Sequence, residues 1–242
     1  LAANYGFEGN LWHTFLTFLL ANSENAYSTA CEVVGEVEGS VNKAALHDFQ
    51  IFKELFEYDL KEMGEKLGTD SLEYHPVNAK GHVFNKRIRD RICDLSKALA
   101  QTDDAEEFKT TVTQFYKEFG VGTFGLHKAF RIEHTEEGAQ IVPITKIAHV
   151  HLDDLVGYDI AKKKLIDNTE AFVKGKKANN CLLFGDAGTG KSSSIKAILN
   201  QYYDQGLRMI EVYKHQFKDL NDVIAQIKNR NYKFIIYMDD LS

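Results

Sequence analysis

The sequence predicts an α/β fold in its C-terminal part, preceded by a helical domain. Apolar residues recur every three or four positions over residues 10–119, which is the spacing of amphipathic helices. From residue 150 onward, short apolar runs alternate with helical segments, the order that is typical of a parallel sheet covered by helices. The charge also changes there: residues 1–150 carry 15 Lys/Arg and 23 Asp/Glu, whereas residues 151–242 carry 14 and 12.

Composition excludes several classes of protein. Hydrophobic residues make up 44% and charged residues 26% of the 242-residue chain, which is typical of a globular protein. Apolar stretches fall short of the roughly 20 residues that span a bilayer, so no membrane partner is expected. Cys31, Cys93 and Cys181 lie far apart without a CxxC pair, which favours a reducing, cytoplasmic location. Neither part has the basic excess that would indicate nucleic-acid binding.

Residues 1–120 are predicted to form a helical N-terminal domain. Its apolar spacing predicts four helices, over residues 10–21, residues 45–67, residues 84–99 and residues 103–119. Gly68 would end the second helix. Asp103, with Glu106 three residues later, is a candidate capping box for the fourth.

Residues 121–150 are predicted to form a β-hairpin or linker between the helical domain and the α/β part. Apolar residues at even offsets from 124 to 132 indicate one strand, and residues 141–150 indicate a second extended run. Residues 136–138 would make the polar turn between them. Pro143 restricts the second run to the edge of a sheet.

Residues 151–242 are predicted to form a partial nucleotide-binding domain of alternating helices and strands. The predicted helices are Asp159–Val173, which Gly175 would end, Lys191–Tyr203 and Lys218–Asn229. The predicted strands are Cys181–Phe184, Leu207–Tyr213 and Phe234–Met238.

One motif in this part matches the phosphate-binding pattern GxxxxGK[ST] at every fixed position. Its residues are Gly185, Asp186, Ala187, Gly188, Thr189, Gly190, Lys191 and Ser192. Glycines let successive backbone N–H groups point toward phosphate oxygens, and the following helix adds its positive end. Lys191 would reach the β- and γ-phosphates, and the Ser192 hydroxyl would bind Mg²⁺. The alternative is a glycine-rich turn that binds nothing, but a predicted strand before it and a helix after it favour a P-loop.

A second motif is the apolar run Phe234–Met238, which two carboxylates follow. Downstream of a P-loop, this pattern indicates a Walker B element. Asp239 would hold Mg²⁺ directly or through water, and Asp240 would orient or deprotonate the attacking water. The alternative is a strand end that carries aspartates without catalytic purpose. Asp240 is one methylene shorter than glutamate, so we expect slow hydrolysis.

Two further groups of residues carry weaker signals. His149 and His151 would share one face of a strand, but no third metal ligand is evident in the sequence. The three lysines 162–164 fit a solvated helix face. Neither group is assigned to the site.

Several segments are also similar to a known family. They are Gly9–Trp12, Asp153–Tyr158, Asn168–Phe172, Asn179–Asp186, Gly188–Ser193 and Asp239–Ser242. On these segments nearly the whole chain resembles a bacterial family of predicted AAA+ ATPases that is filed as a domain of unknown function. The turn at residues 153–158 and the P-loop are shared by AAA+ proteins generally. The NTEAF sequence at 168–172 and the DDLS sequence at 239–242 narrow the resemblance to this family.

The resemblance implies an AAA+-like P-loop NTPase fold with ATP and Mg²⁺ as ligands. It places adenine contacts near Val156 and Gly157, and extends the phosphate-binding segment to Ser193. AAA+ ATPases commonly form rings in which an arginine reaches a neighbour's nucleotide. That arginine, the first sensor residue and the helical lid normally follow the Walker B strand, but this chain ends at Ser242. We therefore expect a truncated chain and a parallel sheet that is incomplete at its C-terminal side.

Three functions follow as hypotheses. The first is an ATPase that, at full length, hydrolyses ATP to move or remodel an unknown protein partner, with a homo-oligomeric ring as its expected assembly. The second is a nucleotide-gated binding module that binds ATP or ADP with little or no turnover. The third, a small-molecule kinase, would need an acceptor site that the sequence does not indicate. For the chain as given, we expect weak nucleotide binding and little hydrolysis.

Overall fold

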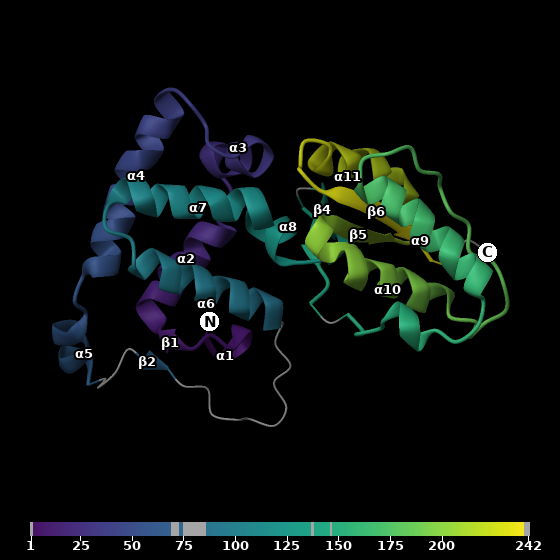
Figure 1. The fold of residues 1–242 in the computed structure, drawn as a ribbon, viewed down its shortest axis with the longest axis horizontal. Helices are drawn as coiled ribbons and strands as arrows, with labels where there is room; N and C mark the ends of the chain where they lie inside the picture. The colour runs from purple at the N-terminus through teal and green to yellow at the C-terminus, as the bar shows by residue number, and fades with distance from the viewer. Residues whose placement is uncertain (1, 69–72, 75–85, 137, 146, 240–242) are drawn as a thin grey trace. The chain divides into compact units, whose positions relative to one another are not determined.

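The computed structural model describes residues 2–68, 73–74, 86–136, 138–145 and 147–239. Backbone proximity divides the chain into two compact units, Leu1–Leu126 and His127–Ser242 (Figure 1). The boundary lies within the segment that the sequence assigned to a hairpin or linker. The three-part division into residues 1–120, 121–150 and 151–242 stays a prediction.

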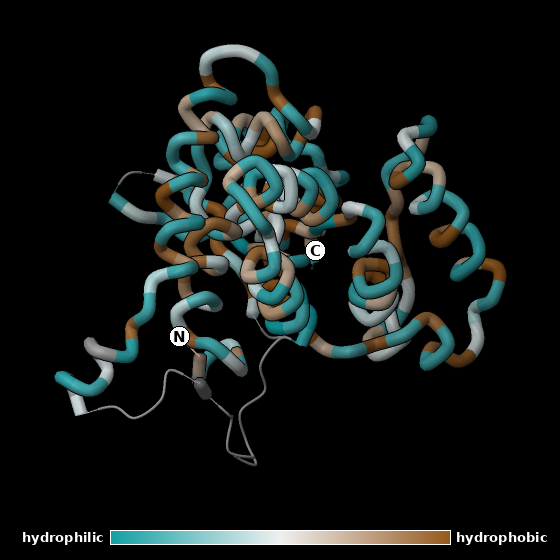
Figure 2. Tube along the Cα trace, turned by 60° about the vertical axis from the view of Figure 1, so that its left-hand side comes forward, coloured by the Kyte–Doolittle hydropathy of each residue, from teal (hydrophilic) through white to brown (hydrophobic). Residues whose placement is uncertain are grey.

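The first unit is helical. Its elements are α1 (Ala2–Tyr5), β1 (Gly9–Asn10), α2 (Leu11–Asn22), α3 (Ala26–Val34), α4 (Ser40–Glu57), α5 (Lys61–Leu67), β2 (Glu73–Tyr74), α6 (Lys86–Ala100), α7 (Ala105–Phe119) and α8 (Gly122–Leu126). β1 and β2 pair antiparallel. Figure 2 shows apolar and polar residues alternating along the helices, as expected where each helix buries one face.

The predicted helix over residues 45–67 is two helices. α4 ends at Glu57, and Tyr58 is extended. The Asp59 carboxylate then accepts a hydrogen bond from the Lys61 backbone N–H at 2.8 Å, and this local turn starts α5. α5 ends where predicted, because Gly68 adopts the left-handed conformation that a residue with a side chain resists.

The N-terminal ends of two other helices differ from the prediction. α7 is capped by Asp104, whose carboxylate accepts from the Glu107 N–H at 2.9 Å, one residue later than predicted. α3 was not predicted at all, and it begins with a capping box between Asn25 and Ser28. Polar side chains near a helix start satisfy backbone N–H groups that lack intrahelical partners.

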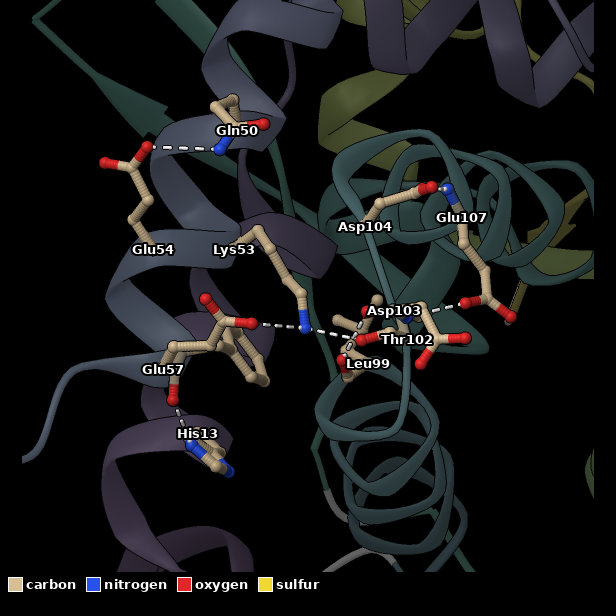
Figure 3. Close-up of polar contacts among 11 residues, drawn as sticks. His13, Gln50, Lys53, Glu54, Glu57, Leu99, Thr102, Asp103, Asp104 and Glu107 are labelled. Atoms are coloured by element: carbon tan, nitrogen blue, oxygen red, sulfur yellow. Dashed lines mark hydrogen bonds and ion pairs between the residues drawn. The ribbon is translucent and has the colours of Figure 1, made fainter.

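The core of the first unit is aromatic. Phe108 is fully buried, and its ring centroid lies 5.2 Å from that of Phe56 and 6.1 Å from that of Phe49. One buried cation lies in the same region: the Lys53 ammonium donates to the Thr102 carbonyl and pairs with the Glu57 carboxylate at 3.0 Å (Figure 3). These contacts join α4 to the connection between α6 and α7. They also replace hydrogen bonds to water that the Lys53 ammonium loses on burial.

The second unit contains the sheet. Its elements are β3 (Ala129–Thr135), β4 (Gly138–Pro143), η1 (Leu152–Asp154), α9 (Asp159–Val173), α10 (Lys191–Tyr202), η2 (Tyr203–Gln205), β5 (Leu207–Val212), η3 (Lys214–Asp219), α11 (Leu220–Ile227) and β6 (Lys233–Met238). The four strands form one sheet in the order β4-β3-β5-β6. β3 and β4 pair antiparallel, whereas β5 is parallel to both β3 and β6. The fold is therefore α/β with a mostly parallel sheet, and β4, which ends at Pro143, is an edge strand.

Helices cover the two faces of this sheet. Leu207 and Met209 of β5 pack with residues of α9 and α10 in one cluster, and Figure 1 shows α9 in front of the sheet. Side chains alternate along a strand, so the buried Ile210 and Val212 face the opposite side. On that side η3 is tied to β3, because the Gln216 amide donates to the Ile132 carbonyl at 3.0 Å.

The predicted strand over residues 124–132 begins too early, because α8 occupies residues 122–126. A Cβ on Gly125 would lie 2.8 Å from the backbone carbon of Gly120, so this tight turn requires glycine. Ala129 is the first residue of β3. The hairpin itself is present, but β3 also pairs with β5 and so belongs to the main sheet.

The predicted strand Cys181–Phe184 is wrong. These residues are not assigned to a strand, because within the described part of the chain no neighbouring strand pairs with them. Instead, Asn168 of α9 binds the Asn179 backbone on both sides, with its amide donating to the carbonyl at 2.8 Å and its oxygen accepting from the N–H at 2.9 Å. Leu183 packs against the core, whereas Leu182 and Phe184 are 73% and 88% exposed.

The stability of the second unit is expected to depend on His127. Burial, and secondarily the positive charge of Arg208, lower the pKa of His127 from 6.5 to about 4. The folded state therefore binds a proton on His127 less readily than the unfolded state does. The contribution of neutral His127 to the free energy of unfolding is complete above pH 6.5 and is lost as the pH falls toward 4. Between pH 7.5 and pH 5 we expect a loss of about 2 kcal/mol. Urea unfolding followed by circular dichroism at several pH values measures it.

The His127→Gln variant provides the control, since glutamine does not titrate. Its free energy of unfolding should fall less steeply over the same pH range, by the same amount of about 2 kcal/mol. Equal pH dependence in the two proteins would show that His127 does not carry this effect.

Candidate functional site

The predicted phosphate-binding loop connects residues 177–184 to α10. Gly188 and Gly190 have φ values of +79° and +83°, and Gly190 is the N-cap of α10. A Cβ at Gly188 would meet nothing within 4 Å, so the loop is open at this position. Gly190 offers the helix no side-chain cap, which leaves the first-turn N–H groups to an external anion.

Lys191 folds over this loop. Its ammonium donates to the carbonyls of Gly185 and Asp186, both at 2.8 Å. The Thr189 hydroxyl also donates to the Asp186 carbonyl at 2.8 Å. These two hydrogen bonds place the Lys191 ammonium against the carbonyls at the start of the loop.

Ser192, the next residue, contacts β6. The Tyr237 hydroxyl donates to the Ser192 Oγ at 2.9 Å. Burial raises the pKa of Tyr237 to about 12, and the nearby Asp239 carboxylate adds to the rise. Tyr237 thus lies within reach of both residues that the sequence assigns to Mg²⁺.

A cavity of about 1080 Å³ opens between these elements. Lys191 and Asp239 line it together with Tyr237, and residues 178–185 and 234–238 form much of its wall. The structure therefore brings the lysine of the first motif and the first aspartate of the second to the same space, although 47 positions separate them in the sequence. This end of the sheet is where the parallel strands finish, the usual place for ligands in α/β proteins.

The charge environment of Asp239 includes the end of β5. The pKa of Tyr213 is raised mainly by the Glu211 carboxylate, then by burial, and then by Asp239. The Glu211 and Asp239 carboxylates therefore both act on Tyr213 near the ends of β5 and β6, and the Arg131 cation acts in the opposite sense. Within the described residues, no three His, Cys, Asp or Glu side chains gather as a metal site of their own.

The donor set nevertheless fits a magnesium ion that is bound together with phosphate. Ser192 and Asp239 supply a hydroxyl and a carboxylate, which are hard oxygen ligands. Mg²⁺ in nucleotide sites usually has only one or two protein ligands, with phosphate and water completing its shell. The open loop at Gly188 leaves space for that phosphate.

The structure shows fewer contacts between the loop and the other predicted site residues. Leu155 lies beside the loop, since its Cδ2 is 3.7 Å from a Cβ built on Gly190. The following Val156 is 93% exposed, and neither it nor Gly157 lines the cavity. Ser193 is in the first turn of α10. Asp240 lies outside the described residues. The roles of all these residues stay predictions.

Sequence reasoning missed Tyr237. Its only signal in the sequence was its position two residues before Asp239. A tyrosine within an apolar strand was attributed to the strand itself. Only the contact with Ser192 reveals its place in the site.

The mostly parallel sheet, the open glycine loop at the head of α10 and the cavity shared by Lys191 and Asp239 together describe a P-loop-like α/β protein. Comparisons with known proteins add two similarities. Residues 125–242 match the model of the family described as "Protein of unknown function (DUF815)".

A curated relative gives a second similarity. Over 81 residues the chain is 36% identical to "Replication factor C large subunit" of Staphylothermus marinus, an alignment that covers 33% of this chain and 18% of that protein. The chain therefore matches less than a fifth of the length of this relative. No solved structure matches the chain.

One finding bears on membranes. Among the described residues, no helix combines the length and the apolar character that crossing a bilayer requires.

Proposed function

We propose that this protein binds ATP with Mg²⁺ at the loop Gly185–Ser192, and that the full-length protein is an AAA+-type ATPase. The observation that carries the proposal is that Lys191 and Asp239 line one cavity beside an open glycine loop at a helix N-terminus. The similarity to the replication factor C large subunit supports the AAA+ type. Ring assembly and remodelling of a protein partner follow from that type and belong to the proposal.

Each group at the site has a distinct task in this proposal. Backbone N–H groups of the loop and of the first turn of α10 bind phosphate oxygens. Lys191 exchanges its two carbonyl partners for the β- and γ-phosphates. Ser192 and Asp239 would hold Mg²⁺, which, when bound, neutralises phosphate charge. Asp240 would orient the attacking water.

A second function has support from one observation. Of the described residues that line the cavity, Lys191 alone carries a positive side chain. Phosphoryl transfer commonly needs a further cation at the γ-phosphate, worth about 10³–10⁵ in rate where an arginine finger supplies it. A nucleotide-gated binding module with little turnover therefore remains the alternative, and phosphate release by the full-length protein distinguishes it from the ATPase.

Calorimetric titration with a series of ligands tests the proposal. ATP, ADP, AMP and adenosine share the base and sugar and differ only in the phosphates. Because the described site is a cradle for phosphate, affinity in the presence of Mg²⁺ should fall as phosphates are removed, and adenosine should bind least. Equal affinity for all four ligands, or no heat with ATP, would refute it.

A further inference from the structure

Tyr237 occupies a defined place beside the proposed cation ligands. Tyr237 is in β6, and Asp239 directly follows Met238, the last residue of that strand. The Tyr237 hydroxyl donates to the Ser192 Oγ at 2.9 Å. Tyr237, Asp239 and Lys191 all line the same cavity.

The tyrosine ring, rather than the loop, sets the position of this hydroxyl. The ring is partly buried, and one side of it packs against the core cluster of α9, α10 and β5. Asp239 lines the same cavity as this ring. One tyrosine therefore binds the Ser192 hydroxyl and faces the same cavity as Asp239, so it lies beside both oxygen-bearing residues of the proposed Mg²⁺ site.

We propose that Tyr237 is a positioning residue of the divalent-cation site, whose hydroxyl fixes the Ser192 hydroxyl beside Asp239 before the cation binds. This inference rests on the proposed function. A serine oxygen has two lone pairs, and the tyrosine proton occupies one of them, so the other stays directed toward the cation. Preorganisation of this kind lowers the ordering cost that is otherwise paid on binding.

A positioning role differs measurably from a tether between β6 and α10. Loss of a tether would disturb the loop itself, and would weaken nucleotide binding equally with and without Mg²⁺. Loss of positioning affects only the part of the affinity that depends on the cation. The dependence of nucleotide affinity on Mg²⁺ concentration therefore separates the two.

The test uses the Tyr237→Phe variant and a fluorescent ATP analogue, titrated in EDTA and at increasing Mg²⁺. We expect the Mg²⁺ concentration for half-maximal affinity to rise about three- to tenfold, the usual range for one lost hydrogen bond. Affinity in EDTA should stay within about twofold of wild type. Tyr202→Phe is the matched control, since Tyr202 is a buried tyrosine at the far end of α10, and it should change neither quantity.

A second variant guards against misfolding. Ser192→Ala should raise the Mg²⁺ requirement, and adding Tyr237→Phe to it should raise the requirement no further, because the partner is already absent. An unchanged or lowered Mg²⁺ requirement in Tyr237→Phe, or additive effects in the double variant, would overturn the inference while leaving ATP binding established. Absence of binding by the wild-type protein would instead overturn the proposed function and this inference with it.

Discussion

Replacing Lys191 with alanine is expected to weaken the binding of ATP in the presence of Mg²⁺ by about 10- to 100-fold, the range for losing hydrogen bonds to a charged group. The ammonium now donates to the Gly185 and Asp186 carbonyls, and in the complex it would donate to phosphate oxygens. Alanine can do neither, so the phosphate charge loses its compensating cation. Calorimetry or titration of a fluorescent ATP analogue measures the change.

Lys196→Ala is the matched control for this prediction. Lys196 is on the same helix, α10, five residues beyond Lys191, and does not line the cavity. The control removes the same charge from the same helix, and we expect its affinity to stay within about twofold of wild type. Equal losses in the two variants would mean that net charge, rather than the loop lysine, attracts the nucleotide.

Replacing Phe108 with alanine is expected to destabilise the first unit by about 3–5 kcal/mol, the usual cost of emptying a buried phenylalanine site. Phe108 is fully buried, and it contacts Phe49 and Phe56 across the helices. Its removal leaves a cavity that these rings fill only in part. The single tryptophan, Trp12, reports unfolding of this unit, because it packs against the same core.

Phe15→Ala controls for the loss of an aromatic ring as such. Phe15 is in α2 of the same unit and is 41% exposed, so its substitution should cost less than about 1 kcal/mol. Urea unfolding of both variants, followed by Trp12 fluorescence, measures the difference. A cost for Phe108→Ala as small as that of Phe15→Ala would show that the aromatic cluster does not hold the unit together.

Helices that end at a glycine were predictable. α9 runs over Asp159–Val173 as expected, since Gly175, just beyond its end, adopts a left-handed conformation. α3 was not predicted, because its nine residues are held mainly by a cap at Asn25 and by burial of Tyr27 and Cys31. Short helices depend on tertiary packing more than on their own repeat.

Strands were predictable from their residues but not from their pairing. β5 and β6 appear where apolar runs indicated them, and each has a parallel partner. Cys181–Phe184 has an equally apolar run, yet it is not assigned to a strand. A run of residues shows that a segment suits a sheet, whereas a strand also needs a neighbour for its backbone hydrogen bonds.

The sequence alone determined that the loop suits phosphate, because the fixed spacing of its glycines, lysine and serine ahead of a helix is a local motif. No distant residue is needed to recognise this motif. Tertiary structure decided which distant groups join that loop: Asp239 across the cavity and Tyr237 on Ser192. The physical reason is the separation along the chain between the residues that determine each feature. Backbone conformation follows from neighbouring residues, but the meeting of α10 with β6 follows from the packing of helices onto a sheet whose strand order the local sequence does not specify.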